Sequence, residues 1–453
     1  MTGPEVVTLL DEGLGNASHL VDLGDGRALA VDPGRDPRPY LRHAERLDLR
    51  VGFAAETHLH ADFVSGSREL AACGTRVLAA RAAGLEHPHT GLADGDEVDL
   101  GGLTLEAVAT PGHTPEHLAY LLRDGSRPVA LFSGGSLLVG SVARTDLTSP
   151  DQTEELARCL YRSITERLLT LPDELPVYPT HGSGSFCSAP AGTDRSSTIG
   201  RERATNPLLA APDEDSFVAG LLDSLGTYPT YFLHLREMNR RGPRVYGEPP
   251  PLRSLDAEEV RRLVAEGAEV VDVRALTDFA TGHLAGSLSV RLRPQFASWL
   301  GWLVAPDRPV VFVVGAGQDR SELVRQCLGI GFEELAGELA GGVEAWAATG
   351  LPLARTRLVR AGEAQDSRLL DVRQNAEFAQ GHVPGALHVE LGSLAAHAGE
   401  LPPGSLVAMC GHGERALTAA SLLARAGRHD VAALLGGPDD VAEAWKRSLV
   451  AAG

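Results

Sequence analysis

The sequence predicts an α/β protein of about three domains, and two observations carry this prediction. The chain has 453 residues, which exceeds the roughly 100–200 residues of an ordinary domain. Its second half contains two similar α/β units whose equivalent residues lie about 99 positions apart. A period of that length corresponds to one small domain and not to a solenoid repeat.

The composition excludes several classes of function. A net charge of −19 argues against a nucleic-acid or anionic-membrane partner, since both require a basic surface. No apolar run approaches the roughly 20 residues of a membrane span, and residues 1–10 lack the build of a signal peptide. The five cysteines are an odd, sparse set without CxxC spacing, which argues against a disulfide framework. We therefore expect a cytoplasmic protein.

The first half of the chain begins with β-structure. Residues 6–34 alternate apolar and polar positions around Gly24-Asp25-Gly26, a pattern typical of a β-hairpin that leads into a further strand. Beyond it the pattern predicts helices at 36–47 and 63–72 and strands at 51–56, 103–109, 118–122 and 129–132.

The segment 57–63, Thr-His-Leu-His-Ala-Asp-Phe, follows an apolar strand and carries polar side chains at alternate positions. In extended backbone such positions face the same side, so His58, His60 and Asp62 should emerge together. His113 and His181 lie in two further Gly-rich turns. This pattern predicts a metal site, whereas a solvated loop with chance histidines is the alternative.

The repeated half begins after a Pro-rich segment at 242–251, which predicts a linker. Each unit contains an Asp-Val-Arg strand end, a Gly-His-x-x-Gly turn, and a late Gly-Gly before a helix with a tryptophan. The strand ends are Val270–Arg274 and Leu369–Arg373, and the turns lie in Asp278–Gly286 and Glu377–Gly385. The glycine pairs are Gly341-Gly342, before Trp346, and Gly436-Gly437, before Trp445.

The loop Cys410-Gly-His-Gly-Glu-Arg415 joins a predicted buried strand at 405–409 to a predicted helix at 415–426. The unpaired amides of a helix N-terminus favour an anion, so the thiolate of Cys410 should be stabilised there. Gly411 and Gly413 allow the backbone to fold around a bound sulfur group, and His412 and Glu414 are expected beside that group. We predict that Cys410 and Arg415 are catalytic and that these four loop residues bind substrate. A buried structural cysteine is the alternative.

Family resemblance extends these predictions. The motifs His-x-His-x-Asp at 58–62, Pro-Gly-His at 111–113, Leu-Phe-Ser-Gly at 131–134 and Arg-Thr-Asp-Leu at 144–147 resemble the metallo-β-lactamase superfamily. The segments 57–66 and 197–207 are similar to its persulfide dioxygenase branch, in the bacterial members that carry rhodanese domains. Both repeats resemble rhodanese domains. The resemblance implies an αββα sandwich at 1–245, followed by doubly wound α/β domains at 252–355 and 356–453.

The resemblance also implies a metal and its ligands. In the family, one iron ion is held by histidines that match His58 and His113 and by an aspartate, while His60 is a neighbour that many superfamily members use. Gly135 stands at the position of that aspartate. Two histidines and a carboxylate suit Fe(II) and O₂, whereas a set of neutral histidines suits zinc equally well. Phe63 replaces a histidine of the dinuclear hydrolases, so we expect one metal ion at most, iron or alternatively zinc.

Other side chains have open roles at this stage. Asp62 is expected to orient a metal-binding histidine, and His181 either serves the same site or shapes its loop. Arg201 and Arg203 either grip the carboxylates of a small thiol or form surface ion pairs. Cys187 either meets a substrate thiol or packs in the core. Cys73, Cys159 and Cys327 are interpreted as core filler.

In the first repeat, Val314 or Gly315 stands where the cysteine belongs, so this domain is expected to be inactive. The leading hypothesis is a fusion protein in which Cys410 carries sulfane sulfur as a persulfide and the N-terminal domain binds a low-molecular-weight thiol persulfide. In the family that this domain resembles, the bound persulfide is oxidised. The expected partners are that persulfide, thiosulfate or sulfite, and further copies of the chain as a homo-oligomer. The alternatives are a sulfurtransferase with a non-oxidising, metal-poor binding module and a thioester hydrolase of glyoxalase type.

Overall fold

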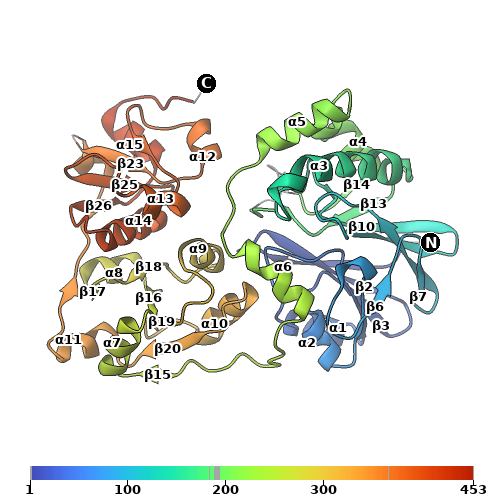
Figure 1. The fold of residues 1–453 in the computed structure, drawn as a ribbon, viewed down its shortest axis with the longest axis horizontal. Helices are drawn as coiled ribbons and strands as arrows, with labels where there is room; N and C mark the ends of the chain where they lie inside the picture. The colour runs from blue at the N-terminus through green and yellow to red at the C-terminus, as the bar shows by residue number, and fades with distance from the viewer. Residues whose placement is uncertain (1–2, 183, 188–193, 366, 452–453) are drawn as a thin grey trace. The chain divides into compact units, whose positions relative to one another are not determined.

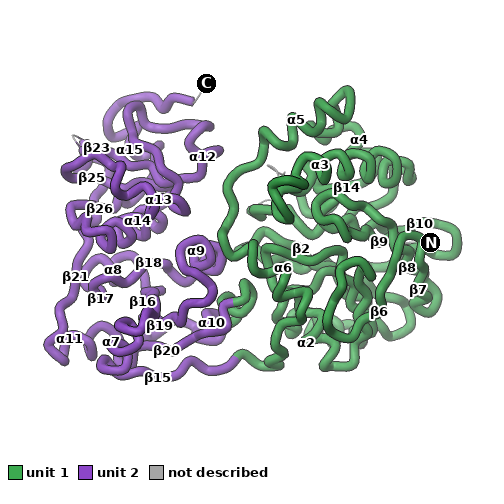
Figure 2. Tube along the Cα trace, viewed as in Figure 1, with its two compact units in different colours: residues 1–249, 325–331 green, residues 250–324, 332–453 purple. Residues whose placement is uncertain are grey.

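The computed structural model describes residues 3–182, 184–187, 194–365 and 367–451 (Figure 1). The chain forms two compact units (Figure 2). The first unit contains residues 1–249 and 325–331, and the second contains residues 250–324 and 332–453. Within the described residues, no helix has the length and apolar character that crossing a membrane requires.

The first unit contains two six-stranded sheets. In spatial order, the first sheet is β1 (Val6–Asp11), β2 (Asn16–Asp22), β3 (Arg27–Val31), β4 (Arg50–Ala55), β5 (Arg76–Ala80) and β6 (Thr90–Leu92). The second sheet is β14 (Ser197–Thr198), β13 (Pro176–Pro179), β10 (Arg127–Gly134), β9 (Leu118–Asp124), β8 (Leu103–Ala109) and β7 (Glu97–Asp99). A small hairpin joins β11 (Leu137–Leu138) and β12 (Ser141–Val142).

Helices cover the outer faces of these sheets. They are α1 (Arg38–Arg46), α2 (Ser67–Ala72), α3 (Thr153–Arg162), α4 (Ile199–Thr205) and α5 (Glu214–Ser224). A further helix, α6 (Phe232–Arg241), binds the segment that follows β4 through Asn239. Alternate residues of the strands point to opposite faces, so each sheet supplies side chains to two cores. One core lies between the sheets and includes Leu29, Phe53, Leu105 and Phe132. Separate cores lie under α1 and α2 and under α3 and α5. The predicted αββα sandwich is confirmed.

The helix predicted at 63–72 begins later, at Ser67. Polar contacts hold the preceding residues in a different conformation. The amide of Ser65 donates to Asn239 Oδ1 at 2.9 Å, and the amide of Gly66 donates to the carbonyl of Pro33 at 2.7 Å. These long-range partners cannot be inferred from the local pattern of apolar residues.

The second unit contains two five-stranded parallel sheets, each flanked by helices, as predicted for doubly wound domains. The first sheet is β15 (Ser254–Leu255), β20 (Leu335–Leu339), β19 (Val310–Val313), β16 (Glu269–Asp272) and β18 (Leu288–Ser289). The second is β22 (Leu358–Val359), β26 (Val431–Leu434), β25 (Leu406–Met409), β23 (Arg368–Asp371) and β24 (Leu387–His388). A further pair joins β17 (His283–Leu284) and β21 (Leu353–Ala354).

The helices that follow these strands begin and end as follows. The first repeat contains α7 (Ala257–Ala265), α8 (Leu276–Thr281), α9 (Phe296–Leu303), α10 (Arg320–Gly329, whose last residues belong to the first unit) and α11 (Gly342–Ala348). The second contains α12 (Asn375–Gln380), α13 (Leu394–His397), α14 (Glu414–Arg425) and α15 (Pro438–Trp445).

Strand register shows which residue of the first repeat matches Cys410. In the second repeat Asp371 pairs with Met409, and in the first repeat the equivalent Asp272 pairs with Val313. The residue after each of these partners is Cys410 in one repeat and Val314 in the other. Val314 therefore occupies the position of the cysteine, and its side chain is buried.

The interpretation of three cysteines as core filler is wrong for two of them. Cys327 is buried, but Cys159 is half-buried and Cys73 is exposed. Cys73 is the C-cap residue of α2, where the chain leaves the helix. Leu70, in the last turn of the helix, is buried, whereas Ala72 is exposed like Cys73.

Candidate metal centre and cysteine loop

Four buried histidines meet at the C-terminal edge of β4, beside the turns that follow β8 and β13. The ring centroids of His58 and His113 are 4.7 Å apart, and His181 lies 5.3 Å from both. His60 is next to His58, at 4.2 Å. The carboxyl ends of parallel strands meet at this edge, which explains why residues distant in the chain converge there.

Hydrogen bonds determine the tautomer of three of these rings. The Nδ1 atom of His113 is 2.6 Å from the carbonyl oxygen of Arg144, which can only accept. The Nδ1 atom of His58 contacts Thr57 Oγ1 at 2.8 Å, and the Thr57 hydroxyl donates its one proton to Asp32. Each Nδ1 therefore carries the hydrogen, and each Nε2 has a free lone pair.

His181 has the same arrangement. Its Nδ1 atom lies 3.1 Å from Asn16 Oδ1 and 3.2 Å from Asp62 Oδ2, which are both acceptors. Asp62 thus lies within ion-pair distance of the His181 ring, and its role in orienting a metal-binding histidine stays a prediction. Burial and the neighbouring histidines lower the pKa of both His58 and His113 well below the ordinary value. Neutral imidazole is the form that binds metals.

His60 is oriented differently from the other three rings. Its Nε2 atom lies 3.2 Å from Asp32 Oδ1 and 3.1 Å from Glu56 Oε2, whereas its buried Nδ1 atom has no hydrogen-bond partner. Burial opposes its charge, but the two carboxylates outweigh this effect and raise the pKa of His60 to about 10. Phe63 stacks on His60 with ring centroids 4.2 Å apart.

The residues present fit a metal ion but do not include the family's carboxylate. The Nε2 atom of His113 is buried and has no partner, so it is available as a ligand. A Cβ atom added at Gly135 would lie 2.4 Å from Cδ2 of His113, which means that the histidine ring fills the space of a side chain there. The donor set is therefore rich in nitrogen, and a facial set of two histidines and one carboxylate from this turn is absent.

Sequence reasoning missed two side chains that support the cluster. Asp32 accepts hydrogen bonds from the amide and the hydroxyl of Thr57, both at 2.7 Å, and its φ angle is 48°. His117 lies beside His58 and accepts from the Gly135 amide at 2.9 Å, so its Nε2 lone pair is already used. The Asp-Pro-Gly turn at 32–34 after β3 is the one signal that could have indicated Asp32.

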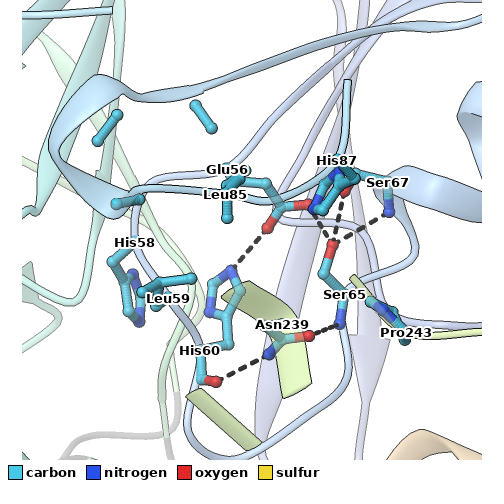
Figure 3. Close-up of a pocket in the computed structure, with 13 residues that line it drawn as sticks. Glu56, His58, Leu59, His60, Ser65, Ser67, Leu85, His87, Asn239 and Pro243 are labelled. Carbon is cyan, nitrogen blue, oxygen red and sulfur yellow. Dashed lines mark hydrogen bonds and ion pairs between the residues drawn. The ribbon is translucent and has the colours of Figure 1, made fainter. Parts of the chain in front are cut away.

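A small, partly open pocket borders the cluster on the side of His58 and His60, with about 380 Å³ of empty space when the open solvent at its mouth is included. Figure 3 shows His60 pointing toward Glu56, with Ser65 and Asn239 linked behind it. Its wall is mostly apolar and includes Leu59 and Leu85. The pocket therefore offers an apolar space with a few polar groups next to the histidines.

The remaining predicted residues of the first unit lie as follows. Arg201, in α4, forms an ion pair with Asp194 at 2.6 Å, and both side chains are about half exposed. Arg203 pairs with Asp173. Cys187 is fully buried. Its sulfur lies within 4.8 Å of a ring nitrogen of His113, so both residues could bind one metal ion. Burial raises the pKa of the Cys187 thiol well above its ordinary value, and the charge of Asp62 adds to this effect.

The loop at 410–415 surrounds a buried sulfur atom. The amide of Gly413 donates to Cys410 Sγ at 3.1 Å. Gly413 has φ of 100° and precedes Glu414, the first residue of the twelve-residue helix α14. Arg415 forms two hydrogen bonds to Glu377, of 2.6 and 2.7 Å. The sulfur therefore lies at a helix N-terminus beside a fixed guanidinium group.

The first repeat contributes residues near this loop. Arg291 forms an ion pair with Glu414 at 3.3 Å, and the guanidinium carbon of Arg415 lies 5.6 Å from the ring centroid of Trp299. Burial lowers the pKa of Arg293, while the charges of Glu414 and Cys410 oppose this effect. The repeat that lacks the cysteine thus supplies positive charge beside it.

The fold and these two sites define the class of the protein, a fusion of a metallo-β-lactamase fold with rhodanese-like domains. The sequence model described as "Rhodanese-like domain" matches residues 256–349 and 355–444. A crystal structure titled as a metallo-β-lactamase from Staphylococcus aureus superposes with a TM-score of 0.65 and 27% identity, over 75% of this chain and 99% of that chain.

The relatives then identify the family. The human mitochondrial persulfide dioxygenase ETHE1 is 32% identical over 201 residues, which are 43% of this chain and 72% of that protein. A hydroxyacylglutathione hydrolase of Pseudomonas savastanoi is 34% identical over 164 residues, which are 36% of this chain and 60% of that protein. The chain belongs to the persulfide dioxygenase family, and with its rhodanese-like domains it belongs to sulfur metabolism.

Proposed function

We propose that the chain is a rhodanese-type sulfurtransferase in which Cys410 carries a persulfide, and that its N-terminal unit binds a low-molecular-weight thiol persulfide. The observation that carries the proposal is the hydrogen bond of 3.1 Å from the Gly413 amide to Cys410 Sγ. This contact supports the proposal because the sulfur lies beside the N-terminus of α14, whose unpaired amides favour a bound anion.

The proposed transfer uses thiosulfate as the donor. The Cys410 thiolate attacks the outer sulfur of thiosulfate, a sulfur–sulfur bond forms at Cys410, and the bond to the sulfonate group breaks. Sulfite leaves with the electron pair of the broken bond, so charge and atoms balance. Arg415, which Glu377 holds in place, and the amides of the 411–413 loop hold the anionic donor.

In the first unit, we propose that the histidine cluster containing His58, His60 and His113 holds one metal ion, iron or zinc. Such an ion would supply a Lewis acid beside the pocket. His181 and Asp62 position the ligands, and the apolar wall of the pocket excludes water from a bound persulfide. Joining both sites in one chain raises the effective concentration of a sulfur intermediate. The three domains at 1–245, 252–355 and 356–453 and a homo-oligomeric state belong to the same proposal.

The test compares the wild type with Cys410→Ser and with the control Cys73→Ser, which changes an exposed thiol. We expect Cys410→Ser to abolish sulfur transfer from thiosulfate to cyanide and Cys73→Ser to retain it. Unchanged transfer by Cys410→Ser would refute the assignment. Uptake of O₂ with a glutathione persulfide, measured on the same preparations, separates an oxidising first unit from a binding module.

Thioester hydrolysis is the second candidate, and the similarity to a hydroxyacylglutathione hydrolase favours it. Phe63 opposes it because an apolar ring stacks on His60 at the position of a second-metal ligand. Hydrolysis of lactoylglutathione by the full chain at rates above those of the His58→Ala variant would favour this candidate over the proposed function.

A further inference from the structure

One contact of the cluster joins two ring nitrogens directly. The Nε2 atoms of His58 and His181 are 3.3 Å apart. The hydrogen of each ring is on Nδ1, committed to Thr57 in one case and to Asn16 and Asp62 in the other. Two ring nitrogens at this distance need a shared proton or a bound cation between them.

The separation matches one metal ion. Two nitrogen ligands that are about 2.0–2.1 Å from a zinc ion and subtend a tetrahedral angle lie roughly 3.3–3.4 Å apart. The third ring, His113, also directs a buried and unpartnered Nε2 atom into the cluster. Three buried imidazole rings thus meet at one place, with ring centroids 4.7–5.3 Å apart.

A sulfur atom lies beside two of these rings. His113 Nε2 or Nδ1, a ring nitrogen of His181 and Sγ of Cys187 lie within 4.8 Å of one another, and all three residues are buried. The backbone of Arg144 joins two of them, because its carbonyl accepts from His113 Nδ1 at 2.6 Å and its amide donates to the Cys187 carbonyl at 3.0 Å. Cys187 is therefore held beside His113 by the backbone and does not depend on side-chain packing alone.

We propose that His58, His113, His181 and Cys187 form a four-ligand zinc site in which the Cys187 thiolate takes the place of the carboxylate missing at Gly135. The proposal rests on the metal site of the proposed function, in which it replaces His60 by His181 and Cys187 as ligands, and it is independent of Cys410. When zinc binds, the Cys187 thiol releases its proton to solvent. Four protein ligands close the site, whereas reaction with O₂ requires open positions. His60 stays paired with Asp32 and Glu56.

The test uses the full chain, without a histidine tag, loaded with zinc or cobalt. X-ray absorption at the zinc edge should give one sulfur at about 2.3 Å and nitrogen at about 2.0–2.1 Å. The cobalt form should have a sulfur-to-cobalt charge-transfer band that Cys187→Ser loses and that Cys73→Ser and Cys410→Ser retain. A band that persists in Cys187→Ser, a zinc shell without sulfur, or the absence of bound metal would each overturn the proposal.

The zinc-edge measurement needs only the wild type, so it remains decisive if Cys187→Ser fails to fold. Sulfur transfer from thiosulfate, assayed on the same samples, reports separately on Cys410. Loss of transfer with an intact zinc–sulfur shell would contradict the proposed function alone, and normal transfer with a zinc site that lacks sulfur would contradict this inference alone.

Discussion

The ring of His113 lies against Gly135 so closely that an added Cβ atom would be 2.4 Å from its Cδ2 atom. His113 is itself fixed by its hydrogen bond to the Arg144 carbonyl. Relatives are expected to carry a carboxylate at this position, and here the ring of His113 fills the space that such a side chain would need. The glycine at this position is therefore part of a packed arrangement.

Gly135→Asp should therefore fail to restore a carboxylate ligand. Forcing a side chain against His113 is an overpacking change, which typically costs about 1–3 kcal/mol. We expect the free energy of unfolding, measured in urea, to fall by this amount. The control is Gly226→Asp in the same unit, where an added Cβ meets no atom within 4 Å. Equal stability of the two variants would contradict the close contact.

The two glycines of the cysteine loop should differ in their tolerance of alanine. Gly413 has φ of 100°, and its added Cβ would lie 3.1 Å from the Leu434 carbonyl oxygen, whereas at Gly411 the nearest atom is Arg415 Nη2 at 3.8 Å. A left-handed conformation costs a non-glycine residue about 1–2 kcal/mol. Gly413→Ala should lose stability by about that amount and lose most of the transfer activity, while Gly411→Ala should retain both. Thermal denaturation and the thiosulfate assay measure these effects.

Val314→Cys should not create a second active loop. The side chain of Gln318 fills the equivalent space, because its Oε1 accepts from the Gly315 amide at 2.8 Å and its Nε2 donates to the Val273 carbonyl at 2.6 Å. In a Cys410→Ser background we expect no recovery of transfer from thiosulfate. Recovery above the background of Cys410→Ser would show that a cysteine alone is sufficient at this position.

The ion pair of Glu377 with Arg415 should make stability depend on pH in the acid range. Burial raises the pKa of Glu377, but the hydrogen bonds from Arg415 outweigh it, and the net pKa lies below the ordinary 4.5. A carboxyl group whose pKa falls on folding stabilises the protein above its unfolded pKa, and this contribution is lost as the pH falls through the folded value. Glu377→Gln should therefore weaken the loss of stability below about pH 4.5.

Urea titrations between neutral pH and about pH 3 measure this difference. The exposed Glu400 provides a matched control, Glu400→Gln. If the pH dependence of Glu377→Gln is the same as that of wild type and of the control, the ion pair does not contribute.

Much of the architecture could be predicted because it depends on local patterns. Alternating apolar residues identified the strands, and the recurrence of Val270–Arg274 at Leu369–Arg373 identified two equivalent domains. The spacing of His58 and His60 indicated a site at a strand end. Strand register then assigned Val314 to the position of the cysteine, which the sequence left open between two residues.

The partners within the histidine cluster could not be predicted in the same way. The pairing of His60 with Asp32 requires a left-handed backbone at Asp32 and strands that bring the two residues together. Cys187 approaches His113 only because the backbone of Arg144 binds both segments. Such contacts depend on tertiary structure, and neither spacing nor composition contains them.

Helix α14, which begins at the cysteine loop, is anchored in the repeat that has no cysteine. Thr418 Oγ1 donates to the Ser289 carbonyl at 2.6 Å, and Ser421 Oγ accepts from the Ser289 amide at 3.2 Å. Removing the first repeat would break both contacts and expose this buried face of α14, although each hydroxyl keeps a partner within the helix. The last domain is therefore not structurally independent of the first repeat. A recombination event that transfers its active site to another gene must transfer both repeats together.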